Sequence, residues 1–161
     1  MSTIETRPEA IRATVHVDAP PEKVWPVVSD VTRMGEWSPE CRKVLLVGAK
    51  QPRLGVRMVG LNRRGLAVWP TVSTIVRFDA GRAVAWKTRE SGATWTYELE
   101  AADGGTRLTG RRDLDRYSTL TRVSAPLIGG AAGHDRELAE GIRTTLDRIK
   151  AAVERPAAPT G

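Results

Sequence analysis

The residue types best suited to chemistry recur at every second position through the middle of this 161-residue chain. Segments that alternate in this way are typical of β-strands, in which every second side chain points to the same face of the sheet. One face would carry Met58, Asn62, Trp69, Thr71, Ser73, Trp86, Trp95, Tyr97 and Arg112. Wide aromatic groups with a few polar groups are typical of a small-molecule pocket, whereas a closed core would consist mainly of Leu, Ile and Val.

The same residues also fit a packed core, in which each tryptophan finds a partner for its indole N–H. Tyr97 would then be a core aromatic with its hydroxyl in solvent. Arg112 would face solvent if a β-bulge shifted the register of its strand. The residue pattern by itself leaves both arrangements open.

Other kinds of reactive centre are not indicated. His16 and His134 have no second ligand at a spacing suited to a metal. Cys41, the single cysteine, has no neighbouring base in the sequence and is expected to be a small filler at the start of a strand. The chain contains no Gly-rich phosphate loop and no Gly-x-Ser-x-Gly motif. We therefore expect neither a metal nor a cofactor.

Composition and charge narrow the range of partners. The chain is 40% hydrophobic and 27% charged, as is usual for a globular protein, and its formal net charge is +6. The charges form no block of like sign, and the arginines are expected on the face opposite the aromatics, so no nucleic-acid partner is predicted. Without a secretory signal or a bilayer-spanning run, we expect a cytoplasmic monomer or homodimer that does not insert stably into membranes.

The elements that must position these residues follow from hydrophobic periodicity. Strands are expected at 11–18, 42–49, 55–63, 67–78, 82–89, 93–101 and 106–117, and helices at 21–30, 31–37 and 134–154. Short turns between consecutive strands predict an antiparallel sheet. The last helix carries an apolar stripe that must pack on this sheet, formed by Leu138, Ile142, Leu146, Ile149 and Val153. Pro70 predicts a sheet edge or a bulge, because proline cannot donate a ladder hydrogen bond.

The expected fold class is therefore α+β, with a curved antiparallel sheet of about seven strands wrapped around a long C-terminal helix and two short helices after the first strand. Residues 11–154 are expected to form a single domain. Residues 1–10 and 155–161 are expected to be a disordered lead-in and tail, and 118–133 an irregular link into the last helix.

Several motifs accompany this order of elements. They are Val-Asp-Ala-Pro-Pro-Glu-Lys-Val-Trp-Pro-Val-Val-Ser-Asp at 17–30, Trp-Ser-Pro-Glu at 37–40, Gly-x-Asn at 60–62, Trp69, Trp-x-Tyr at 95–97, and Gly-His-Asp-Arg-Glu-Leu at 133–138. With them, residues 11–154 resemble the SRPBCC superfamily, the helix-grip fold of START lipid-transfer domains, birch-pollen allergens and polyketide cyclase/dehydrase proteins. The resemblance is strongest to its small single-domain actinobacterial members.

The resemblance implies a deep apolar cavity between the C-terminal helix and the sheet, with its entrance near the short helices and the loop before the last helix. It implies that Trp37, Leu138 and Ile142 join the sheet residues above as ligand-binding residues. The implied function is to bind or carry a hydrophobic or aromatic small molecule, either a lipid or a polyketide-like compound.

The resemblance also implies an enzymatic alternative, a polyketide aromatase/cyclase-dehydratase that acts on a poly-β-keto intermediate without a metal or nucleotide cofactor. Tyr97 and Arg112 are then the catalytic candidates. Tyr97 would donate a hydrogen bond to an enolate and Arg112 would hold an oxyanion. Whether the protein catalyses a reaction or only binds is left open by the sequence.

Overall fold

The computed structural model describes residues 10–114 and 131–156, with side chains in the second range from Arg136 onward. Its elements are β1 (Ile11–Val17), α1 (Pro21–Ser29), η1 (Val31–Arg33), α2 (Met34–Trp37), β2 (Cys41–Val47), β3 (Arg57–Arg64), β4 (Ala67–Asp79), β5 (Ala83–Thr88), β6 (Thr94–Ala102), β7 (Gly105–Asp113) and α4 (Ala131–Glu154). The expected lead-in at 1–9, most of the link at 118–133, the strand end at 115–117, the tail at 157–161 and the side chain of His134 lie outside the described residues.

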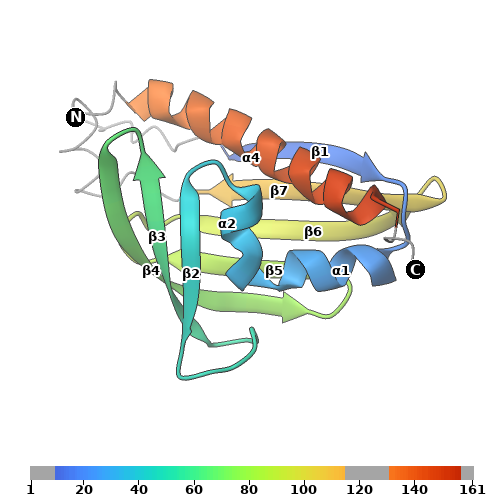
Figure 1. The fold of residues 1–161 in the computed structure, drawn as a ribbon, viewed down its shortest axis with the longest axis horizontal. Helices are drawn as coiled ribbons and strands as arrows, with labels where there is room; N and C mark the ends of the chain where they lie inside the picture. The colour runs from blue at the N-terminus through green and yellow to red at the C-terminus, as the bar shows by residue number, and fades with distance from the viewer. Residues whose placement is uncertain (1–9, 115–130, 157–161) are drawn as a thin grey trace, which may run out of the picture.

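The seven strands form one antiparallel sheet in the order β1-β7-β6-β5-β4-β3-β2. The sheet curves around the helices, with α4 lying along β1 and β7 (Figure 1). The short helices α1 and α2 follow β1 and lie beside α4. This arrangement confirms the expected α+β helix-grip fold. Within the described part, none of the helices is long and apolar enough to span a membrane.

Prolines and a tight turn explain several of the boundaries. Pro21 begins α1, where the missing N–H costs nothing because the first helical turn has no acceptor for it. Pro70 lies in β4 before the β4–β5 ladder begins at Ser73 and Thr88, so β4 is locally a sheet edge, as expected. Asp103 and Gly104 both have positive φ, 50° and 77°, and make the tight hairpin between β6 and β7.

The apolar stripe of α4 forms the centre of the core. Leu146 and Ile149 are fully buried, and Ile142 is nearly so. Gly110 of β7 lies directly beneath the helix: a Cβ there would stand 2.9 Å from Ile142 Cγ2 and 3.4 Å from Leu146 Cδ2. Only glycine lets α4 approach β7 this closely. The helix is thereby held against the β1–β7 side of the sheet, and space remains over the other side.

Candidate functional site

A cavity of about 460 Å³ lies between the inner face of the sheet, α4 and the short helices. This volume falls in the range of small-molecule sites in proteins. The residues predicted from the sequence that line it are Met58, Asn62, Trp69, Thr71, Ser73, Trp86, Trp95, Tyr97 and Arg112 on the sheet and Leu138 and Ile142 on α4. Period-2 alternation in β3 to β7 thus brings side chains from five strands to one space.

Aromatic rings form one wall of the cavity. The rings of Trp86 in β5 and Tyr97 in β6 stack with centroids 5.7 Å apart and an interplanar angle of 22°. Trp95 faces Trp86 directly across the β5–β6 ladder. Trp86 and Tyr97 are buried, while Trp95 and Trp69 are half-buried and line the same space. A broad, flat apolar surface of this kind suits a planar or ring-containing ligand.

Neutral polar groups on the adjoining strands are paired with one another. The hydroxyls of Ser73 and Thr88 lie 2.9 Å apart in a buried hydrogen bond. Asn62 Nδ2 donates to Thr71 Oγ1 at 3.1 Å and to the Trp69 carbonyl at 3.4 Å. These pairs hold their side chains in place and leave oxygen lone pairs for a ligand that offers a donor.

Two weakly acidic groups in the cavity remain protonated at neutral pH. Burial raises the pKa of the Tyr97 phenol far above its ordinary value; the nearby Cys41 adds to this, and a hydrogen bond with Thr145 opposes it. Burial also raises the pKa of the Cys41 thiol to about 11; a hydrogen bond with the backbone of Lys43 opposes the shift, and the charge of Glu40 adds to it. Tyr97 can therefore donate a hydrogen bond to a ligand, and Cys41 is a poor nucleophile.

Charged side chains line another part of the cavity. Arg112 is only 6% exposed, so its register is not shifted toward solvent. Arg64 at the end of β3 forms an ion pair with Glu137 of α4, which joins the β3–β4 hairpin to the helix. Burial raises the pKa of the Glu40 carboxyl; Arg64 and Arg112 oppose the shift, while Glu137 adds to it. The cavity thus combines an aromatic wall with cationic and acidic groups.

Sequence reasoning missed several residues that line the cavity, among them Glu40, Cys41, Arg64, Thr88 and Thr145. Two of these residues could have been predicted from the periodicity of their strand or helix. Thr88 lies two residues after Trp86 in the same strand, and Thr145 lies three residues after Ile142 in the same helix. Glu40 and Arg64 lie at element ends, where alternation carries no signal.

Trp37 is the predicted ligand-binding residue that the structure does not place on the cavity wall. It is buried, and the guanidinium of Arg33 lies 4.8 Å from the centre of its ring. Its carbonyl accepts a hydrogen bond from Arg148 of α4 at 3.2 Å. Among the described residues, its indole Nε1 has no hydrogen-bond partner. The short helix α2 presents Met34 to the cavity instead.

The part of the chain that the structure describes holds no group of three or more His, Cys, Asp or Glu residues that could bind a metal ion. His16 lies at the surface, with Nε2 3.2 Å from Asp18 Oδ1.

Comparison with protein families identifies the chain. The family described as "Polyketide cyclase / dehydrase and lipid transport" matches residues 8–154. The chain belongs to this family. No curated protein gives a significant match.

Solved structures share the fold of this polyketide cyclase/dehydrase and lipid transport family member at low sequence identity. The KanY protein (ms6282) is 16% identical, with a TM-score of 0.69 over 91% of this chain and 98% of that one. The Polyketide_cyc-like protein Cgl2372 from Corynebacterium glutamicum is 24% identical, with a TM-score of 0.57 over 91% and 89%. The di-domain ARO/CYC StfQ from the steffimycin biosynthetic pathway is 13% identical, with a TM-score of 0.71 over 90% of this chain and 50% of that one.

Proposed function

We propose that this protein binds or carries a hydrophobic or aromatic small molecule, lipid-like or polyketide-like, in the cavity between sheet and α4. The observation that carries the proposal is the 460 Å³ space walled by the stacked rings of Trp86 and Tyr97. The family description, which names both polyketide chemistry and lipid transport, supports the same ligand classes.

The chemistry of the lining suggests how such a ligand would lie. Apolar rings or chains would cover the wall of Trp86, Trp95 and Tyr97, where each square ångström removed from water contributes about 25 cal/mol. An oxygen-bearing group would face Arg112, whose buried guanidinium lines the cavity and carries several N–H donors in a fixed fork. The ligand is therefore expected to be amphipathic, with an anionic or carbonyl oxygen at one end.

Replacing tryptophans of the wall should weaken binding of an aromatic anion such as 8-anilinonaphthalene-1-sulfonate. For Trp86→Ala and Trp95→Ala we expect at least about a tenfold rise in Kd, or ~1.4 kcal/mol, measured by fluorescence titration. Lys87→Ala is the matched control, because Lys87 neighbours Trp86 but is exposed and does not line the cavity. Equal effects of all three variants would contradict a binding site on this wall.

Cyclisation is the second candidate function, favoured by the presence of Tyr97, Arg112 and Glu40 in one cavity. Enolisation of a poly-β-keto chain needs a donor for the developing oxyanion and a base for the carbon acid. The protonated Tyr97 and the cationic Arg112 suit the first role. Glu40, whose pKa is raised by burial, suits the second. The similarity to the ARO/CYC StfQ supports the same candidate.

Turnover separates catalysis from binding. If the protein cyclises a poly-β-keto substrate, Tyr97→Phe should lower the rate of product formation by about 100-fold, as loss of an oxyanion donor does elsewhere. Its affinity for 8-anilinonaphthalene-1-sulfonate should change less than about threefold, because the ring that stacks on Trp86 remains. Product analysis by mass spectrometry measures the rate. Wild-type protein without turnover, or a Tyr97→Phe variant as fast as wild type, would rule out this role for Tyr97.

A further inference from the structure

The positive charge of the chain is concentrated in β2, β3, β4 and the loop between β2 and β3. Residues 41–78 contain eight Lys and Arg residues and no Asp or Glu. The whole chain has 25 cationic and 19 acidic residues, so the remainder has 17 and 19 and is slightly negative. The charges look scattered along the sequence, but the sheet places the three strands that carry six of these eight cations side by side at one edge.

Exposed apolar side chains are concentrated in the same strands and loops. Among the described residues, all the exposed large hydrophobic side chains fall between residues 45 and 76: Leu45, Val47, Leu54, Leu61, Leu66, Val68 and Val76. Leu66 lies in the turn of the β3–β4 hairpin and is 97% exposed. Apolar groups gathered in this way usually mark an interaction surface.

The strand register interleaves the two kinds of side chain on the outer face. Lys43 of β2 pairs with Leu61 of β3, and Arg63 of β3 pairs with Val68 of β4. Leu45 lies two residues from Lys43 on the same face of the edge strand β2. We call this surface the hairpin patch; it consists of Lys43, Leu45, Leu61, Arg63, Leu66 and Val68.

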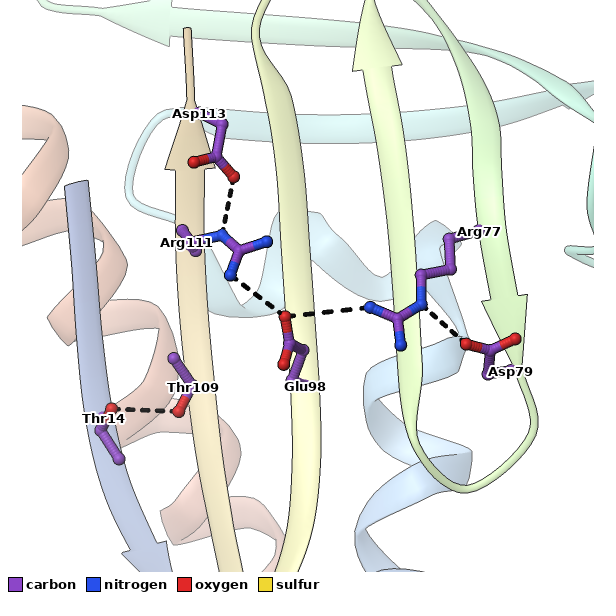
Figure 2. A network of polar contacts seen from close by, with 7 residues as sticks. All are labelled: Thr14, Arg77, Asp79, Glu98, Thr109, Arg111 and Asp113. Atoms are coloured by element: carbon purple, nitrogen blue, oxygen red, sulfur yellow. Dashed lines mark hydrogen bonds and ion pairs between the residues drawn. The ribbon is translucent and has the colours of Figure 1, made fainter. Parts of the chain in front are cut away.

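The rest of the outer face has a different character (Figure 2). There Arg111 contacts Glu98 at 3.4 Å and Asp113 at 2.7 Å, and Arg77 contacts Asp79 at 2.7 Å. Each cation in this network is neutralised by a carboxylate. Within the described residues, Lys43 and Arg63 form no ion pair; Arg63 Nε donates to the Gly65 carbonyl at 2.9 Å. The charges of the hairpin patch are therefore available to an external anion.

We propose that the hairpin patch docks reversibly on an anionic lipid bilayer, with Leu66 reaching into the headgroup region. Interleaved aliphatic and cationic side chains match a surface that is anionic outside and apolar beneath. A single-stranded nucleic acid would instead call for aromatic side chains on which bases stack, and the patch has none. A second copy of this chain would place the cations of one patch against those of the other.

Docking would bring the cavity to the bilayer. Arg64 and Gly65 of the same hairpin line the cavity, as does Trp69 near the start of β4. A ligand leaving the membrane would thus meet the cavity beside the docked hairpin. This last step rests on the proposed function, whereas docking itself does not.

Vesicle sedimentation of the full chain tests the proposal. We expect binding to phosphatidylcholine vesicles that contain 30% phosphatidylglycerol, and little binding to phosphatidylcholine alone. Leu66→Glu and Lys43→Glu should each lower the partition coefficient at least about tenfold, because each removes an anchoring contact and adds a negative charge. Arg12→Glu and Lys87→Glu reverse exposed cations outside the patch and should lower the partition coefficient less than about threefold. Circular dichroism confirms that each variant is folded.

Several results would overturn docking at this patch. They are equal losses in the patch and control variants, equal binding to neutral and anionic vesicles, or tighter binding to a 30-nucleotide single strand than to anionic vesicles. Docking would also be overturned if the wild-type protein did not bind vesicles and light scattering showed instead a dimer that Leu66→Glu dissociates. Trp86→Ala serves to separate the two proposals. It should still dock while losing affinity for 8-anilinonaphthalene-1-sulfonate, so failure of one proposal leaves the other measurable.

Discussion

Gly141→Leu should fill the cavity and abolish ligand binding while leaving the fold at least as stable as before. Gly141 lies in α4 and lines the cavity. A Cβ added there meets one atom within 4 Å, Pro39 Cγ at an ordinary 3.6 Å, so a longer side chain extends into open space. Affinity for 8-anilinonaphthalene-1-sulfonate should fall at least about 100-fold, because leucine occupies volume that the ligand needs.

The stability of this variant is what makes the test decisive. Replacing glycine in a helix interior gains about 0.8 kcal/mol, so urea unfolding should show an unchanged or slightly higher free energy. Ala151→Leu is the matched control, since Ala151 is exposed on the same helix; it should affect neither binding nor stability by more than about 0.5 kcal/mol. Unaltered affinity in Gly141→Leu would place the ligand elsewhere on the molecule.

Gly110→Val should be among the most damaging single changes to stability. A Cβ at Gly110 already lies 2.9 Å from Ile142 Cγ2 and 3.2 Å from Tyr97 Cε1, and valine adds two methyl groups to that contact. Overpacking of this kind costs about 1–3 kcal/mol. We expect about 3 kcal/mol, because Ile142 and Tyr97 both belong to the core and cannot withdraw into solvent. The measurement is the midpoint and slope of urea unfolding.

Thr109→Val introduces the same side chain one residue away, on the outer face of β7. It removes only the exposed hydrogen bond between the hydroxyls of Thr109 and Thr14, which are 3.0 Å apart (Figure 2). Its cost should stay within about 0.5 kcal/mol. If Gly110→Val were equally mild, the close approach of α4 to β7 would not be what sets the position of the helix.

The aromatic wall of the cavity was predictable from local pattern. A strand presents every second residue to one face whatever its partners are, so the alternation around Trp69, Trp86 and Trp95 was enough to predict their common side. The apolar stripe of α4 likewise predicted that Leu138 and Ile142 face the sheet. These assignments depend only on the side-chain periodicity of a single strand or helix, and that periodicity can be read from consecutive residues.

Periodicity could not predict the orientation of residues at or beside the ends of strands and helices. Trp37 ends a four-residue helix, too short for a periodic pattern, and the structure places it in the core beside Arg33. Glu40 precedes β2 and Arg64 closes β3, so which way each side chain points depends on how the chain turns next. Their positions on the cavity wall are set by contacts with residues far away in sequence, such as that of Arg64 with Glu137.

The sequence by itself determined the order of elements, the inward face of each strand and the family resemblance, because these are properties of short segments. The tertiary structure decided the rest. Gly110 draws α4 toward β7 and leaves a space over the aromatic strands. The sheet order brings three strands that carry six cations and several exposed aliphatic side chains together at one edge. The cavity and the hairpin patch arise from distances between segments, and no local pattern encodes those distances.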